Sequence, residues 1–270
     1  MAVTGFQRAV CRLIASNRLE QGEAYVAGGV ALNLLTGGNR VSRDIDLFHD
    51  TIEALDATWQ ADRRLLENHG YELRSIHERR GYVEVLVGKG GDTVLMQWTH
   101  DSAFRFFPLV QHEELGLTLH PFDLATNKVL ALAGRLEIRD WIDIITCHER
   151  IQPLGYLAWA ACGKDPGFSP LAILEEAGRS GRYTVAELEG LSFDGPPPDL
   201  AGLLRKWRSM LQEAREIVAV LPAGRVGACV LQRQGDLYRG NPAQLRQNLA
   251  TSDLAFHTGS IRGAYPQVSN

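Results

Sequence analysis

The spacing of hydrophobic residues differs between the two halves of the chain. The first half contains both the helical spacing and the alternation typical of strands. Apolar residues recur at helical spacing from Phe6 to Ile14, which predicts an opening amphipathic helix. Beyond it, short apolar runs with the alternation of strands are interspersed with helical segments. The predicted strands are 25–27, 44–48, 71–76, 82–87 and 93–99, and the predicted helices are 30–35 and 51–68. Thr51 is placed to cap the second of these helices, and Gly70 to follow its end.

From Asp123, a predicted N-cap, the pattern becomes mainly helical. Helices are predicted at 139–147, 171–177, 185–191 and 200–220, with loops at 163–170 and 196–198 and a loop-like tail at 257–263. We therefore predict an α+β protein with a mixed sheet and flanking helices, followed by a helical C-terminal region. The predicted domains are 1–120 and 121–270.

Composition and charge narrow the choice of partners. The 270 residues are 45% hydrophobic and 22% charged, with a formal net charge of −4, so a nucleic-acid partner would need a local basic patch. The cysteines show no zinc-binding spacing and are predicted to be reduced, buried thiols; they are Cys11, Cys147, Cys162 and Cys229. No apolar run approaches the ~20 residues of a membrane span, so we expect a cytoplasmic protein without a membrane partner.

The segment from Tyr25 to Phe48 carries the candidate chemistry. Gly28 and Gly29 lie between a predicted strand and a helix, where backbone N–H groups favour phosphate. Asp44 and Asp46 lie on the next strand, with side chains on one face and ~6–7 Å apart. Two carboxylates at that spacing suit Mg²⁺ shared with substrate phosphates, with Mn²⁺ as the alternative ion. Taken singly, the glycines also fit a tight turn and the aspartates a solvated strand edge.

The two motifs together resemble the nucleotidyltransferase superfamily, which has the polymerase-β-like fold. That family carries hG[GS] at a helix start and [DE]h[DE] on a following strand. The form Arg40-x-Ser42-x-Asp44-Ile45-Asp46-Leu47 most resembles the AbiEii/AbiGii-type toxin branch. The resemblance implies Asp44 and Asp46 as catalytic metal ligands, and Gly28, Gly29, Arg40 and Ser42 as nucleotide-binding residues.

The helical half carries a second motif of the same branch, in which Lys128 is followed by Arg135, Asp140 and Asp143. Lys128 lies within an apolar stripe, so it either extends along the core to solvent or meets an anionic group. The resemblance implies that Lys128 contacts nucleotide phosphates and that Asp143 completes the active centre. Asp140 is either part of that centre or an ion-pair partner of Arg135 or Arg139.

One position departs from the family pattern. A third carboxylate is expected on the strand at 93–99, where Gln97 stands; a neutral amide is a poorer metal ligand and no general base. Glu84 and Asp101 are alternative acids.

The resemblance implies an enzyme that transfers NMP from an NTP to a hydroxyl, with RNA, such as a tRNA 3′ end, as acceptor and with a cognate antitoxin protein, as in a type IV toxin–antitoxin (abortive infection) pair. The alternatives are a nucleotidyltransferase acting on a small molecule such as an antibiotic, and a non-catalytic nucleotide-binding module.

A basic segment lies within the predicted helix at 200–220. It consists of Arg205, Lys206 and Arg208, with Trp207 between them, and it forms either a stacking surface for RNA or a solvated helix face.

Overall fold

The computed structural model describes residues 3–267, with the side chains of residues 18–21 left undescribed; the predicted domains also include residues 1–2 and 268–270, which lie outside the described residues. The chain forms two compact units. The first runs to Ala103 and includes Leu109–His120, and the second combines Phe104–Pro108 with the chain from Pro121 onward.

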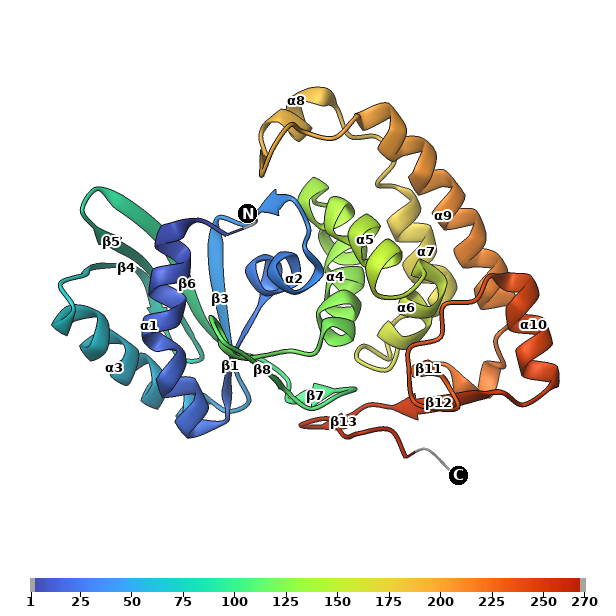
Figure 1. Cartoon of the computed structure of the whole chain (residues 1–270), viewed down its shortest axis with the longest axis horizontal. Helices are drawn as coiled ribbons and strands as arrows, with labels where there is room; N and C mark the ends of the chain where they lie inside the picture. Colours follow the sequence, from blue (N-terminus) through green and yellow to red (C-terminus); the bar gives the residue numbers. More distant parts are fainter. Residues whose placement is uncertain (1–2, 268–270) are drawn as a thin grey trace. The chain divides into compact units, whose positions relative to one another are not determined.

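The first unit is built on a seven-stranded sheet with the strand order β4-β5-β6-β3-β1-β9-β8 (Figure 1). The strands are β1 (Ala24–Ala27), β3 (Asp44–His49), β4 (Glu72–Arg79), β5 (Tyr82–Lys89), β6 (Asp92–His100), β8 (Val110–His112) and β9 (Gly116–Thr118). The β1–β9 and β3–β6 pairs are parallel, whereas the β1–β3, β4–β5, β5–β6 and β8–β9 pairs are antiparallel. The short strand β2 (Arg40–Val41) precedes β3.

Helices cover the two faces of this sheet unequally. α1 (Gly5–Gln21) and α3 (Ile52–Asn68) lie on one side, and α2 (Gly28–Thr36) lies on the other, against β1 and β3 (Figure 1). The face under α1 and α3 forms the core, where the Trp59 and Trp98 rings lie 4.7 Å apart and Trp98 Nε1 donates to Asp62 Oδ2 at 3.0 Å. The opposite face is half-buried along β3, β5 and β6, and this face carries the polar side chains described below.

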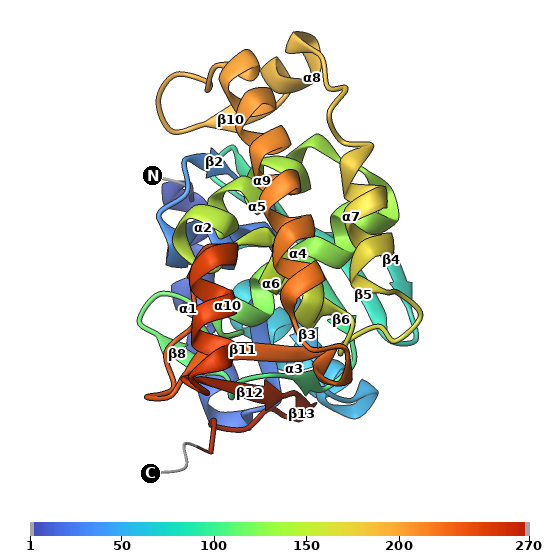
Figure 2. The same cartoon turned by 90° about the vertical axis from the view of Figure 1, so that its right-hand side faces the viewer.

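The second unit is mainly helical. Its helices are α4 (Pro121–Arg135), α5 (Ile138–Arg150), α6 (Leu154–Ala161), α7 (Pro170–Gly178), α8 (Val185–Glu189), α9 (Leu200–Val220), the 3-10 turn η1 (Ala223–Arg225) and α10 (Pro242–Ala250). Every residue of α6 is buried, and α4, α7 and α9 pack around it. Figure 2 shows the length of α9, with α10 packed beside it.

Strands complete this unit. β11 (Ala228–Gln232) pairs antiparallel with β12 (Leu254–Thr258), and β13 (Ser260–Ile261) pairs antiparallel with β7 (Phe104–Arg105). A further short strand is β10 (Ser192–Phe193). Gln152 links β11 and the segment after it to the helices, because its Nε2 donates to Val230 O at 2.9 Å and to Tyr238 O at 2.7 Å.

The predicted fold class is confirmed: a mixed sheet with flanking helices precedes a mainly helical region. The Thr51 cap is also confirmed, since its side chain accepts a hydrogen bond from Ala54 N. The four cysteines are buried thiols outside any disulfide, as predicted. Among the described residues, no helix combines the length and the apolar character needed to cross a membrane.

Two local predictions were wrong. Asp123 does not cap α4, which begins at Pro121; its carboxylate accepts from Phe106 N at 2.8 Å and Phe107 N at 3.0 Å, and pairs with Lys164 Nζ at 2.8 Å. The tail at 257–263 is not a plain loop, because β12 ends at Thr258 within it and β13 follows at Ser260–Ile261. In both cases the partners are distant in sequence, which a local pattern does not reveal.

Candidate active site

A glycine corner joins β1 to α2, and Asp46 lies directly against it. Gly28 has a φ of +66°, a backbone conformation that L-residues rarely adopt. A Cβ atom added to Gly28 would lie 1.7 Å from Asp46 Oδ2. Residue 28 therefore has both a backbone and a spatial reason to be glycine. The two predicted motifs meet here because β1 and β3 are antiparallel neighbours with Ala27 opposite Asp46.

The second glycine of the corner adjoins Arg40 and Ser42. A Cβ atom added to Gly29 would lie 2.6 Å from Arg40 Nη2 and 2.6 Å from Ser42 Oγ. Both Arg40 and Ser42 are buried. The residue before the helix, Ala27, has no side chain that could cap the first N–H groups of α2. The helix start is thus bordered by a guanidinium and a hydroxyl, groups that bind phosphate oxygens.

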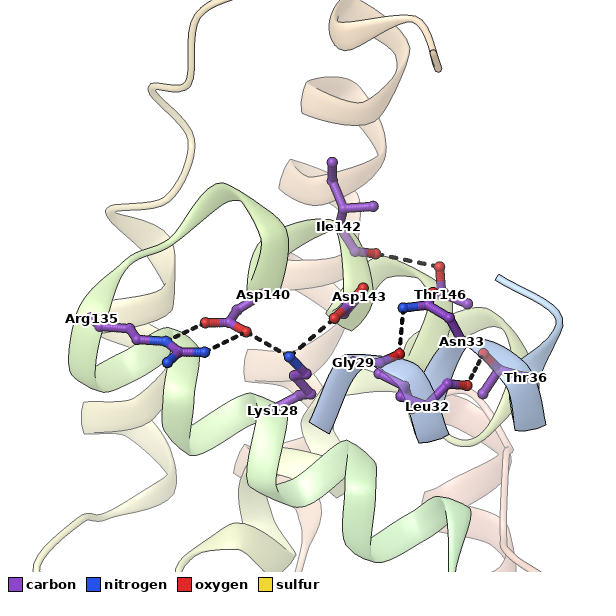
Figure 3. Close-up of polar contacts among 10 residues, drawn as sticks. All are labelled: Gly29, Leu32, Asn33, Thr36, Lys128, Arg135, Asp140, Ile142, Asp143 and Thr146. Atoms are coloured by element: carbon purple, nitrogen blue, oxygen red, sulfur yellow. Dashed lines mark hydrogen bonds and ion pairs between the residues drawn. The ribbon is translucent and has the colours of Figure 1, made fainter. Parts of the chain in front are cut away.

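Asn33 supports the corner from within α2. Its side-chain Nδ2 donates to Gly29 O at 2.8 Å, as Figure 3 shows. The backbone carbonyl of Asn33 accepts from Gly38 N at 3.0 Å. The sequence pattern did not single out Asn33. Its position four residues after Gly29, within an otherwise apolar helix, was the available signal.

Asp44 and Asp46 share one face of β3. Burial alternates along the strand, with Ile45 and Leu47 in the core and both aspartates half-buried on the opposite face. Two carboxylates on one strand face, beside a glycine corner, fit a divalent ion whose remaining ligands are phosphate oxygens. No group of three or more His, Cys, Asp or Glu side chains among the described residues is arranged to hold a metal ion.

Gln97 lies beside Asp46. The two residues are register partners in the parallel β3–β6 pair, so Gln97 occupies the position where a third carboxylate was expected. Its Nε2 donates to Glu84 Oε1 at 2.9 Å on β5. A hydrogen bond from His77 lowers the pKa of Glu84 below its ordinary value, against the opposing effect of burial. The other candidate acid, Asp101, is exposed, and its Oδ1 accepts from Ser102 N.

The second unit holds the helical motif as a buried ion-pair cluster (Figure 3). Lys128 on α4 is only 8% exposed, and its Nζ lies 2.9 Å from Asp140 Oδ1 and 3.1 Å from Asp143 Oδ2, both on α5. Lys128 therefore meets anionic groups and does not extend to solvent. The i, i+3 spacing of the two aspartates brings both carboxylates to the same face of α5.

Asp140 is also the partner of Arg135. Arg135 donates from Nε to Asp140 Oδ2 at 2.6 Å and from Nη2 to Oδ1 at 3.0 Å, a bidentate arrangement. Burial raises the pKa of Asp140, but the Arg135 hydrogen bonds and the Lys128 charge outweigh it, so the pKa lies below its ordinary value. The structure therefore confirms the interpretation of Asp140 as an ion-pair partner of Arg135.

The basic segment on α9 is not a stacking surface. Trp207 is 1% exposed, and its ring packs edge-on against Trp141 in the core. Lys206 pairs with Glu149, and Arg205 pairs with Asp199 at 3.7 Å. The RNA-stacking interpretation of this segment was wrong, because its aromatic residue points inward and two of its cations pair with carboxylates.

The sheet fold, the glycine corner and the acidic strand together define the nucleotidyltransferase class. A family model described as the nucleotidyl transferase AbiEii toxin of type IV toxin–antitoxin systems matches residues 12–164. This match covers more than half of the 270 residues, so the chain belongs to the AbiEii nucleotidyltransferase toxin family. The resemblance stated from the two sequence motifs is thereby confirmed.

Comparison with solved structures finds similar chains at low sequence identity. A candidate nucleotidyltransferase from Helicobacter pylori is 17% identical with a TM-score of 0.50, and the match covers 78% of this chain and 94% of that one. JHP933 from Helicobacter pylori is 17% identical with a TM-score of 0.51, covering 78% and 91%. MenT4, a nucleotidyltransferase toxin from Mycobacterium tuberculosis, is 14% identical with a TM-score of 0.49, covering 80% and 83%. Among curated protein sequences, none matches this chain.

Proposed function

We propose that this family member is a Mg²⁺-dependent enzyme that transfers NMP from an NTP to a hydroxyl of an RNA acceptor, and that it acts as the toxin of a type IV toxin–antitoxin pair. The single observation that carries the proposal is the contact between Gly28 and the Asp46 carboxylate. This contact places a metal-ligand type of side chain against the start of a helix suited to phosphate.

The chain's own residues have distinct roles in the proposed reaction. Asp44 and Asp46 hold the ion, which when bound neutralises charge on the phosphates and activates the attacking hydroxyl. The N–H groups at Gly28 and Gly29, with Arg40 and Ser42, orient the triphosphate. The acceptor oxygen then forms a bond to the α-phosphorus while the bond to the bridging oxygen breaks, and pyrophosphate leaves.

The family resemblance assigns Lys128 and Asp143 to the same reaction, Lys128 with the triphosphate and Asp143 with the acceptor hydroxyl. Two buried carboxylates contact Lys128 Nζ, which favours its being fixed in position before substrate binds. In this proposal Asp140 has a supporting role through its bonds to Lys128 and Arg135. The partners we propose are an NTP, an RNA acceptor such as tRNA, and an antitoxin protein.

The direct test is transfer of label from α-³²P-NTP to total tRNA in the presence of Mg²⁺. Asp46→Asn should abolish transfer, because an amide is a weaker metal ligand and carries no charge. Asp92→Asn is the matched control, since Asp92 is an exposed carboxylate at the start of β6. If the Asp46→Asn protein transfers label at the wild-type rate, the metal assignment is refuted.

The acceptor is tested separately with the wild-type protein. Label transfer to tRNA, but not to a panel of aminoglycosides and lincosamides, is the expected result. Transfer to one of the antibiotics alone would replace the RNA acceptor by a small molecule. Tight NTP binding by calorimetry without transfer to any acceptor would instead indicate a non-catalytic nucleotide-binding module.

A further inference from the structure

Four polar side chains form a row across four adjacent strands of the sheet. Asp46 on β3 is the register partner of Gln97 on β6, Gln97 is the partner of Glu84 on β5, and Glu84 is the partner of His77 on β4. Residues that are opposite each other on adjacent strands point to the same face and lie within contact distance. The row therefore extends from the proposed metal ligand to the edge of the sheet.

Glu84 is held by three hydrogen-bond partners within and beside this row. Its Oε1 accepts from Gln97 Nε2 at 2.9 Å and from the Tyr82 hydroxyl at 3.1 Å, and its Oε2 contacts His77 Nδ1 at 2.7 Å. The Glu84 side chain is 13% exposed, whereas that of His77 is 67% exposed. A carboxylate with three hydrogen-bond partners has little freedom to rotate, so it is a firm acceptor for the Gln97 amide.

This bond determines which way the Gln97 amide faces. An amide group is planar, with its nitrogen and oxygen on opposite edges. Because the amide nitrogen donates to Glu84 on β5, we expect the amide oxygen of Gln97 to face away from Glu84. The register neighbour of Gln97 on that side is Asp46 on β3. An amide oxygen and a carboxylate are both acceptors, so a cation between them is favourable, and amide oxygens are accepted ligands of hard divalent ions.

We infer that Glu84 is a positioning residue, which fixes the Gln97 amide so that its oxygen serves with Asp46 as a ligand of the divalent cation. This inference rests on the proposed function, and it explains how the site works with an amide where a third carboxylate was expected. Outer-shell partners of metal ligands typically change metal affinity by about 10-fold to 100-fold when removed.

The experiment measures Mn²⁺ affinity of the full chain by electron paramagnetic resonance, without acceptor. Glu84→Leu should raise the Kd by about 10-fold. Glu84→Gln should remain within about 2-fold of the wild type, because it keeps an acceptor oxygen for Gln97. His77→Ala is the control, since it removes one of the three partners of Glu84 but leaves the Gln97 bond, and it should weaken Mn²⁺ binding less than Glu84→Leu does.

Gln97→Met provides a second route if Glu84→Leu does not fold. It removes the amide at similar length and should weaken Mn²⁺ binding to the same degree. In the Glu84→Leu, Gln97→Met double variant, no further loss is expected, because both changes remove one ligand. Thermal unfolding of each variant identifies those that are folded.

The failures are distinguishable. Normal Mn²⁺ binding by Glu84→Leu or Gln97→Met, with binding lost in Asp46→Asn, overturns the role of Glu84 and leaves the proposed function standing. Equal weakening by Glu84→Gln and Glu84→Leu shows an effect of charge and also overturns positioning. If Asp46→Asn binds Mn²⁺ as the wild type does, the proposed function itself fails.

Discussion

Replacing Gly28 by alanine should disable the site at a small cost in stability. The φ of +66° alone costs an L-residue about 1–2 kcal/mol. The new Cβ would also start 1.7 Å from Asp46 Oδ2, whereas an ordinary contact begins at 3.4 Å, so the carboxylate has to retreat. A displacement of ~1 Å in an active site can cost ~100-fold in rate, which corresponds to about 3 kcal/mol of transition-state stabilisation.

Gly90→Ala separates the two effects. Gly90 has a φ of +62°, and nothing lies within 4 Å of the position of its Cβ. It therefore carries the same backbone penalty without displacing a side chain. Urea unfolding measures stability, and label transfer from α-³²P-NTP together with Mn²⁺ affinity measures the site.

We expect both glycine variants to lose a similar free energy of unfolding and only Gly28→Ala to lose about 100-fold in transfer and to bind Mn²⁺ more weakly. If Gly28→Ala matches Gly90→Ala in transfer and in Mn²⁺ affinity, the closeness of Gly28 to Asp46 has no functional meaning. The reasoning from the glycine corner would then be refuted.

Three further predictions concern the second unit. Lys128→Met and Lys164→Met each remove a cation paired with buried aspartates, so each should cost about 3–5 kcal/mol in urea unfolding. Per amount of folded protein, label transfer should fall in Lys128→Met but not in Lys164→Met. If the two variants transfer label equally well per amount of folded protein, Lys128 has no role in the reaction. Burial lowers the pKa of His148 to about 4, so the unfolded chain takes up a proton below pH 6.5 that the folded chain does not, and stability falls from pH 6.5 towards 4 by up to about 3 kcal/mol. His148→Asn should flatten this part of the stability curve, and an unchanged slope would show that His148 is not its source. Trp207→Ala should cost about 3–5 kcal/mol in unfolding, because it empties a core position, whereas a loss of RNA binding without a loss of stability would contradict its inward orientation.

The parts of the site within one strand–helix–strand segment were predictable from sequence. Gly28 and Asp46 are close because β1 and β3 are adjacent antiparallel strands, so a local motif already contains both contact partners. The sequence also identified Gln97 at the position of the expected third acid and Glu84 as an alternative acid. What it could not supply was the register, which makes them neighbours of Asp46 and of each other.

Features that depend on distant partners were missed. Asp123 has the residue type and position of a helix cap, yet its carboxylate binds the backbone of Phe106 and Phe107 and the ammonium of Lys164. β9 has only three residues and begins at a glycine, so no hydrophobic period marks it. In α6, all positions are buried, and a helix that is apolar all round has no amphipathic pattern to detect.

The pairing of β1 has a consequence for synthesis of the chain on the ribosome. Its parallel neighbour is β9, and Thr118 Oγ1 donates to Val26 O at 2.8 Å across a separation of 92 residues. Such a contact has to wait until the later segment has been translated, and long-range strand pairing is slow. In the nascent chain, β1, which ends at the glycine corner, therefore lacks its neighbour β9 until β9 has been translated. We expect catalytic competence to arise late in translation, which would delay the activity of a toxin relative to the start of its own synthesis.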